Sequence, residues 1–263
     1  MYVATLIANS KNRNLSELIL KQVVNDLGGV KYKVLDDNIA VDISLVSEPS
    51  NFEIVWKQLQ KHQIDIVIQP IKNRRKNILL ADMDSTMIEQ ECIDELADEA
   101  GVGKRVAEIT KRAMNGELDF EDALIERVKL LKGLSSDIIV NVLKGRITLM
   151  PGAESLIKTM KRNGSYCALV SGGFTDFTEA ISKMLGFDEN RANTLLQKNK
   201  ILTGEVQFPI LGRQAKVEAL TDITKKLDRT HNDVIAVGDG ANDLGMLTKA
   251  GMGVALHAKP IVE

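Results

Sequence analysis

The sequence predicts an α/β protein with a ferredoxin-like α+β domain over residues 1–72 and a parallel-sheet domain over residues 77–263. Residues 2–70 follow the order βαββαβ, which is typical of two helices on one face of an antiparallel sheet. From residue 77, short apolar runs end in polar or glycine-rich segments, as buried parallel strands do. The gap between the first two runs is too long for one crossover helix, so a helical cap is expected at about 91–148.

Apolar periodicity predicts each element of the first domain. The sequence from 72 to 77, KNRRKN, is polar and basic and is interpreted as a linker. This domain contains no cluster of catalytic residue types, so ligand-sensing, structural and dimerising roles all stay open. The expected strands are 2–8, 31–35, 39–46 and 64–70, and the expected helices are 15–27, which stops at Gly28 and Gly29, and 51–61.

The second domain is predicted from four apolar runs and a helix-rich insertion. Ligands of such sheets bind beyond the carboxyl ends of the strands, so the chemistry is expected directly after each run. The insertion contains four helical patterns. The expected strands are 77–81, 166–170, 233–237 and 252–256, and the expected cap helices are 91–101, 104–114, 120–134 and 137–143.

Composition excludes several classes of protein. The 263 residues include 34 Lys and Arg against 36 Asp and Glu, a net charge of -2, so neither nucleic acid nor a membrane is an expected partner. No apolar run approaches the roughly 18 residues of a membrane span, and no signal peptide is recognised at the start, so a cytoplasmic location is expected. Cys92 and Cys167 lack CxxC spacing, which disfavours a disulfide framework or structural zinc.

Polar residues with catalytic potential follow three of the predicted strands. Asp82 and Asp84 follow the first strand. Ser171 and Gly172 end the second strand, where a hydroxyl and backbone amides suit an anion. Each pattern alone also suits an ordinary turn or helix cap. Their combination at one edge of a sheet favours a single site.

The third of these strands ends in the segment GDGAND, which adds Asp239 and Asp243. Four carboxylates would then gather with only Lys216 to offset them, so a cation is expected. Carboxylate oxygens without His or Cys suit Mg²⁺. A carboxylate, a metal and an anion cradle together suggest phosphoryl transfer, in which an aspartate can be the nucleophile.

The motifs DMDST, SGGFT, a downstream lysine and GDGAND, in that order, resemble the four motifs of the haloacid dehalogenase superfamily. Longer stretches at 82–98, 120–134, 169–175 and 238–247 resemble its phosphoserine phosphatase family. The resemblance implies a Rossmann-like core with a helical cap. The first domain resembles an ACT-like regulatory module at fold level only.

The resemblance also implies a role for each motif residue. Asp82 would attack phosphorus, and Asp84 would protonate the leaving oxygen and later help to activate water. The Asp82 side chain, the Asp84 carbonyl and Asp239 would bind Mg²⁺, with Asp243 in support. The phosphoryl oxygens would be held by Ser171, the Gly172 amide and Lys216, and Asn242 would line the same site.

The cap is expected to select the substrate. By resemblance, Glu91 would receive the ammonium of phosphoserine and Arg127 would pair with its carboxylate. Met114 and Phe120 match apolar positions that close over the substrate, although such residues at helical spacing are more often core. The implied reaction is hydrolysis of O-phospho-L-serine, the last step of serine biosynthesis. The alternatives are transfer of the phosphoryl group to another hydroxyl, such as that of homoserine, and a serine-sensing binding protein. The candidate assembly is a homodimer.

The sequence departs from the family pattern at one residue and at its end. Ala123 stands where the family often has Ser, which weakens the transfer of substrate contacts. The sequence stops at residues 258–263, where relatives usually continue through another strand and helix, so a truncated chain with an uncovered apolar surface is expected.

Overall fold

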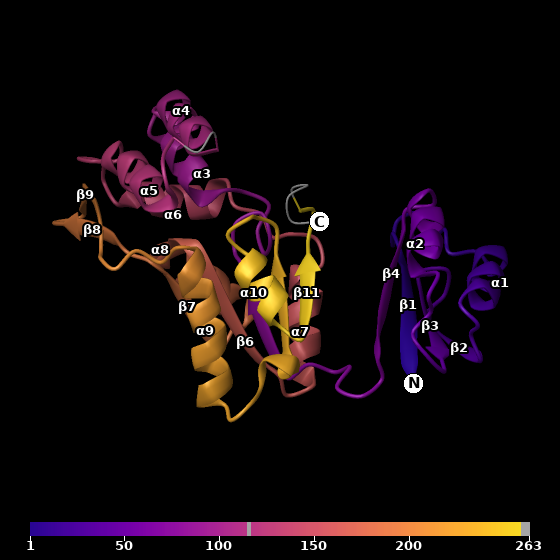
Figure 1. The fold of residues 1–263 in the computed structure, drawn as a ribbon. Helices are drawn as coiled ribbons and strands as arrows, with labels where there is room; N and C mark the ends of the chain where they lie inside the picture. The colour runs from indigo at the N-terminus through magenta and orange to yellow at the C-terminus, as the bar shows by residue number, and fades with distance from the viewer. Residues whose placement is uncertain (115–116, 259–263) are drawn as a thin grey trace. The chain divides into compact units, whose positions relative to one another are not determined.

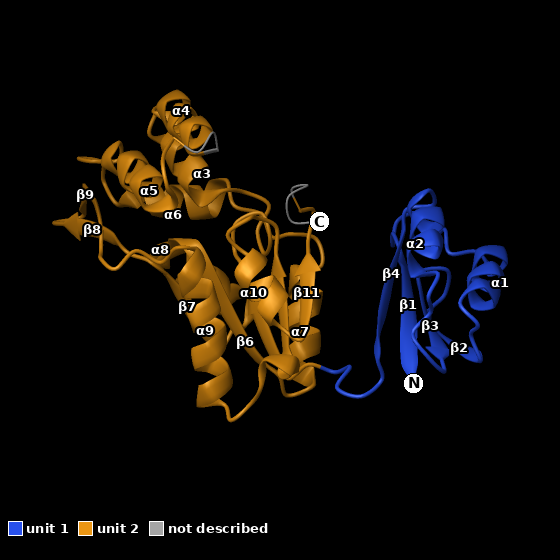
Figure 2. Cartoon of the chain, in the orientation of Figure 1, with its two compact units in different colours: residues 1–75 blue, residues 76–263 orange. Residues whose placement is uncertain are grey.

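The computed structural model describes residues 1–114 and 117–258, and the chain divides into two compact units, Met1–Arg75 and Lys76–Glu263 (Figures 1 and 2). Across the described ranges, no helix is long and apolar enough to cross a membrane. Met114 belongs to a described helix, but its side chain lies outside the described part of the chain.

The first unit is an antiparallel sheet with both helices on one face. Its strands lie in the order β2-β3-β1-β4, and every neighbouring pair is antiparallel. Alternate residues of the strands, such as Leu6 and Ile43, pack with Val23 and Leu59 of the helices in one buried cluster. The elements are β1 (Tyr2–Ala8), α1 (Glu17–Asp26), β2 (Lys31–Asp36), β3 (Ala40–Leu45), α2 (Phe52–Gln60) and β4 (Ile64–Pro70).

Part of the predicted linker is held on this sheet. Both terminal nitrogens of Arg74 donate to the carboxylate of Asp42 at 2.6 Å, and one of them also donates to Thr5 Oγ1 at 3.0 Å. Residues 72–75 are therefore attached to the first unit. The sheet order agrees with the predicted ferredoxin-like order, whereas an ACT-like regulatory role stays a prediction.

The core of the second unit is a parallel sheet in the order β11-β10-β5-β6-β7. Alternate residues of β5 face opposite sides: Leu79 packs in a cluster with Ile157 and Phe177, and Leu80 packs with Leu220 and Met246. Helices thus cover both faces, which confirms the predicted α/β fold. The elements are β5 (Ile78–Ala81), α7 (Ala153–Arg162), β6 (Tyr166–Phe174), α8 (Thr175–Leu185), β7 (Glu189–Asn193), α9 (Arg213–Lys226), the 3₁₀ turn η1 (His231–Asp233), β10 (Val234–Gly238), α10 (Leu244–Lys249) and β11 (Met252–Ala255).

A helical cap lies between β5 and α7 in the chain. Figure 1 shows its helices at the end of the sheet to which the arrow of β11 points. This is the carboxyl end of the parallel strands, where a site was expected. The helices are α3 (Cys92–Glu99), α4 (Gly103–Met114), α5 (Phe120–Lys129) and α6 (Asp137–Gly145).

Several features differ from the expected elements, among them the cap helix expected at 120–134, which ends at Lys129. β6 continues to Phe174 with a shift in its pairing to β7 after Val170, so the SGG segment belongs to the strand's irregular end. The edge strand β7 and the hairpin of β8 (Leu195–Lys198) and β9 (Ile201–Val206) were not predicted. The hairpin supports the cap, because the Gly133 amide donates to the Leu202 carbonyl at 2.9 Å and the Leu202 amide donates to the Leu134 carbonyl at 2.9 Å.

Candidate active site

A pocket of about 470 Å³ opens between the core sheet and the cap. The neighbouring strands β10, β5 and β6 end beneath it, and α3 and α5 of the cap contribute its other side. The predicted site residues that line it are Asp82, Asp84, Glu91, Phe120, Arg127, Ser171, Gly172, Asp239 and Asn242. Lys216 and Asp243 are buried behind these residues.

Lys216 is held between two carboxylates. Its Nζ lies 2.6 Å from Asp82 Oδ2 and 2.6 Å from Asp243 Oδ1, and its side chain is 2% exposed. Burial alone would lower the pKa of Lys216, but the two carboxylates outweigh burial and raise it. Lys216 therefore stays charged inside the protein, and α9 supplies the cation that was expected to offset these carboxylates.

Asp82 is an acid under strong desolvation. Its Oδ1 accepts a hydrogen bond from the Met83 amide at 2.7 Å. Burial raises the pKa of Asp82, with Lys216 lowering it and Asp243 raising it further. When burial and a neighbouring carboxylate outweigh one cation in this way, a second cation beside the carboxylate would stabilise its anion.

Asp84 is suited to hold a proton. Its Oδ2 accepts from the Cys92 amide at 3.3 Å, whereas its Oδ1 is buried with no hydrogen-bond partner among the described residues. Burial raises the pKa of Asp84 well above its usual range, and the charges of Glu91 and Asp82 raise it further. Asp82 and Asp84 therefore have different environments only two residues apart, which is how one site obtains a nucleophile and an acid.

The GDGAND turn is organised by Asp243. Asp243 Oδ2 accepts from the amides of Asp239 at 3.2 Å and Gly240 at 3.0 Å. A Cβ on Gly238 would lie 2.4 Å from Asp243 Cγ, so this close approach needs glycine. Thr86 Oγ1 donates to Asp239 Oδ1 at 3.3 Å.

Three buried carboxylates could hold a metal ion. Oxygen atoms of Asp82, Asp239 and Asp243 all lie within 4.8 Å of one another. The donors are all oxygen, which suits a hard divalent cation, and the Asp82 anion, whose pKa burial raises, would gain stability from a cation beside it. The residues present therefore fit a metal ion.

The end of β6 forms an anion cradle. Ser171 Oγ accepts from the Gly173 amide at 2.9 Å, which leaves the hydroxyl hydrogen of Ser171 to donate elsewhere. Asn193 Nδ2 donates to the Gly172 carbonyl at 2.8 Å, and the Leu211 amide donates to Asn193 Oδ1 at 2.7 Å. Asn193 thus fixes the backbone of the cradle. Asn193 is not predicted from the sequence, because it lies on the unpredicted strand β7 and in no recognisable motif.

Cap residues supply opposite charges across the pocket. Glu91 Oε1 accepts from Ser85 Oγ at 2.8 Å, and Ser85 has φ +54°, an uncommon conformation for a residue other than glycine. Arg127 Nε donates to the Ala123 carbonyl at 3.1 Å. Ala123 is 2% exposed and does not line the pocket. The departure from the family pattern at Ala123 therefore leaves the lining unchanged.

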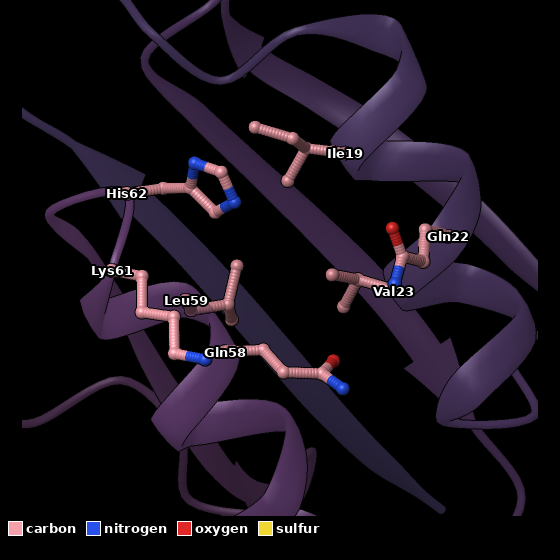
Figure 3. Close-up of a pocket in the computed structure, with 7 residues that line it drawn as sticks. All are labelled: Ile19, Gln22, Val23, Gln58, Leu59, Lys61 and His62. Carbon is pink, nitrogen blue, oxygen red and sulfur yellow. The ribbon is translucent and has the colours of Figure 1, made fainter.

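A second groove, of about 260 Å³, lies between α1 and α2 of the first unit (Figure 3). Val23 and Leu59 are buried in it, whereas Gln22, Gln58 and His62 are exposed around it. Its seven lining residues include no carboxylate and no hydroxyl or thiol nucleophile. The catalytic residue types therefore gather in the second unit.

Comparison with known proteins identifies relatives of this chain. A family model described as haloacid dehalogenase-like hydrolase matches residues 79–248. The phosphoserine phosphatase of Archaeoglobus fulgidus is 42% identical over 209 residues, which are 79% of this chain and 60% of that protein. The chain thus spans 60% of the length of that curated relative.

Solved structures extend the comparison to the fold. The crystal structure of a haloacid dehalogenase family hydrolase from Salmonella enterica serovar Typhi is 30% identical with a TM-score of 0.88, and the match covers 99% of this chain and 91% of that one. A substrate-bound phosphoserine phosphatase complex is 45% identical with a TM-score of 0.67, over 72% of this chain and 90% of that one.

Proposed function

The chain belongs to the haloacid dehalogenase-like hydrolase family, and from that membership we propose that it hydrolyses O-phospho-L-serine to L-serine and phosphate. The observation that carries the proposal is the contrast between Asp82, ion-paired with buried Lys216, and Asp84, whose raised pKa favours the protonated acid. A phosphatase that acts through an aspartyl-phosphate needs both a nucleophilic carboxylate and a carboxylic acid.

In the first step, a carboxylate oxygen of Asp82 attacks phosphorus and forms an acyl phosphate. The bond from phosphorus to the serine oxygen breaks, and Asp84 gives its proton to that oxygen, so that L-serine leaves. In the second step, water attacks phosphorus while Asp84 takes up a proton. The bond from phosphorus to the Asp82 oxygen breaks, which regenerates the Asp82 carboxylate and releases inorganic phosphate.

Three groups would hold the phosphoryl oxygens during both steps. The Ser171 hydroxyl still has its hydrogen to donate, the Gly172 amide lies in the cradle that Asn193 fixes, and Lys216 carries a positive charge. Asn242 lines the same pocket. Donors held in a buried site stabilise the charge of the transition state without reorganising.

Mg²⁺ is the proposed cofactor. The Asp82 side chain, the Asp84 backbone carbonyl and Asp239 would hold it, and Asp243 would support the turn, since both Asp243 oxygens already accept hydrogen bonds within the protein. When bound, the ion supplies positive charge that neutralises the phosphoryl oxygens and the surrounding carboxylates.

The opposite charges of the cap would recognise the amino acid portion of the substrate. Glu91 would bind the ammonium, and the guanidinium of Arg127 would bind the carboxylate with two parallel hydrogen bonds. Phe120 lines the pocket beside Gly172, where a Cβ on Gly172 would lie 3.0 Å from the ring. Phe120 is proposed to close over the bound substrate.

Phosphate release from L-phosphoserine tests the proposal directly. Release is measured with Mg²⁺ and with EDTA, for the wild type and for Asp82→Asn, with phosphothreonine and a sugar phosphate as comparison substrates. Metal-dependent release that is selective for phosphoserine and absent in Asp82→Asn is the expected result. A folded wild type that releases no phosphate would contradict the proposal, and phosphoserine consumption that requires added homoserine would favour transfer instead. A cytoplasmic location and a homodimer stay predictions.

A further inference from the structure

The cap joins the core of the second unit through two hinge segments, residues 85–91 and 146–150, which run side by side. Ile88 and Leu149 form an antiparallel bridge between them. The Glu89 amide donates to the Thr148 carbonyl at 3.0 Å, and the Met150 amide donates to the Met87 carbonyl at 3.0 Å. The entry and exit of the cap are therefore paired like a short piece of sheet.

One side chain reinforces this pairing from both of its ends. Gln90 Nε2 donates to Thr148 Oγ1 at 2.8 Å, and Gln90 Oε1 accepts from the Thr148 amide at 2.9 Å. The Thr148 hydroxyl in turn donates a hydrogen bond to Glu89 Oε2 at 2.5 Å. The flipped amide of Gln90 would place Nε2, a donor, against the Thr148 amide, which is also a donor, so one orientation of the Gln90 amide fits these bonds.

The backbone of Gln90 connects the hinge to the pocket. Its carbonyl accepts from the Ser85 amide at 3.2 Å, and Ser85 Oγ in turn donates to Glu91, the residue after Gln90. Glu91 is itself exposed at the rim, so neighbouring packing alone does not fix its carboxylate. Its direction depends on Ser85 and on the backbone that Gln90 anchors.

We propose that Gln90 is a positioning residue for substrate selection, which holds Glu91 toward the substrate's ammonium by pairing with Thr148 across the hinge. The proposal rests on the proposed function, because Glu91 must meet an ammonium for its direction to matter. Gln90 does not line the pocket and touches no proposed reacting group. Its loss is therefore expected to alter ammonium recognition and to spare the chemical step.

Two substrates that differ only in the ammonium separate this role from a general structural one. Phosphoserine is compared with 3-phosphooxypropanoate, the same ester without the amino group. In Gln90→Ala we expect KM for phosphoserine to rise about fivefold with kcat within about twofold, the range of one or two net hydrogen bonds. KM for 3-phosphooxypropanoate should not change.

Variants of Thr148 test the other side of the pair. Thr148→Val removes the hydroxyl but keeps the backbone donor, so an effect smaller than that of Gln90→Ala is expected, and Thr148→Ser should restore wild-type behaviour. Thr159→Val is the matched control, because the Thr159 hydroxyl donates to its own helix at the Ser155 carbonyl. Equal losses on both substrates, or unchanged kinetics in Gln90→Ala, would overturn the proposal.

Amide hydrogen exchange distinguishes failure of this inference from failure of the proposed function. The Thr148 amide should exchange faster in Gln90→Ala, and the Asp82 amide, which donates to the Val237 carbonyl in the core, should not. A wild type that does not hydrolyse phosphoserine refutes the proposed function, and with it the role in ammonium recognition. Unchanged exchange at Thr148 refutes the hinge pairing itself, whatever the activity.

Discussion

Lys216 and Asp243 form a buried ion pair in which Nζ lies 2.6 Å from Oδ1, with side chains that are 2% and 0% exposed. The second oxygen of Asp243 accepts from two backbone amides of the GDGAND turn. One carboxylate therefore fixes both the buried cation and the turn that contains Asp239. Folding and catalysis depend on the same contacts here, so substitutions are expected to affect both.

Replacing Lys216 by Met should destabilise the protein and abolish phosphate release. The variant leaves Asp82 and Asp243 buried without their cation, and breaking a buried pair by removing one partner costs about 3–5 kcal/mol. Urea unfolding followed by circular dichroism measures the loss. Lys183→Met, at an exposed position of α8, is the matched control. Wild-type stability and activity in Lys216→Met would refute the role of this pair.

Gly238→Ala should distort the site through a single methyl group. The new Cβ would lie 2.4 Å from Asp243 Cγ, so Asp243 must shift away from Lys216 and the turn amides. Overpacking of this kind lowers the free energy of unfolding by about 1–3 kcal/mol. The effect on catalysis is expected to be larger than the effect on stability, and it should appear as a fall in kcat. Gly145→Ala serves as the control, because its Cβ would meet no atom within 4 Å at the end of α6. Thermal melts and phosphate release together should separate the two variants.

Arg127→Lys should weaken recognition of the substrate's carboxylate. Lysine keeps the charge but loses the planar fork, so KM for phosphoserine is expected to rise about tenfold. Phosphoethanolamine, which has the ammonium but no carboxylate, should show little change between wild type and variant. Steady-state kinetics on the two substrates measure the difference. An equal rise in KM on both would mean that Arg127 supports the cap without contacting the carboxylate.

The sequence predicted those parts of the fold that a pattern of neighbouring residues specifies. Continuous apolar runs located β5, β6, β10 and β11, and the motifs that follow three of these strands converge on one pocket. β7 was missed because Glu189, Asn190, Arg191 and Asn193 give it no apolar pattern, although the sheet and α8 cover it. Local patterns cannot detect a polar edge strand whose stability comes from its neighbours.

The supporting residues of the site could not be predicted for a related reason. Asn193 acts on Gly172 and Leu211, and Gln90 acts on Thr148, which is 58 residues away. An isolated Asn or Gln gives no sequence signal of its partner, whereas aspartates in glycine-rich turns give an explicit one. The proposed reacting groups were therefore recognisable, and the residues that orient them required three-dimensional structure.

Glu189 should make stability depend on pH in the acidic range. Burial raises its pKa, but hydrogen bonds from Lys226, Tyr166 and Arg191 outweigh burial and lower the pKa to about 2. A lowered folded-state pKa contributes stability above the unfolded value near 4.5, and that contribution disappears as pH falls toward 2. Glu189→Gln should therefore lower the free energy of unfolding by about 1 kcal/mol at pH 7, a figure reduced by solvent screening.

The difference in the free energy of unfolding between Glu189→Gln and wild type should become smaller as pH falls below about 4.5. Protonation of Glu189 then removes the same charge from the wild type. Urea midpoints of both proteins at pH 7, 4 and 3 measure the narrowing, and comparison at each pH cancels the titration of the other carboxylates. Glu205→Gln, on the exposed side of β9, controls for the loss of one negative charge. A difference in urea midpoint that stays constant from pH 7 to pH 3 would show that the charge of Glu189 contributes nothing to stability. Only the packing of its side chain would then join β6, β7 and α9.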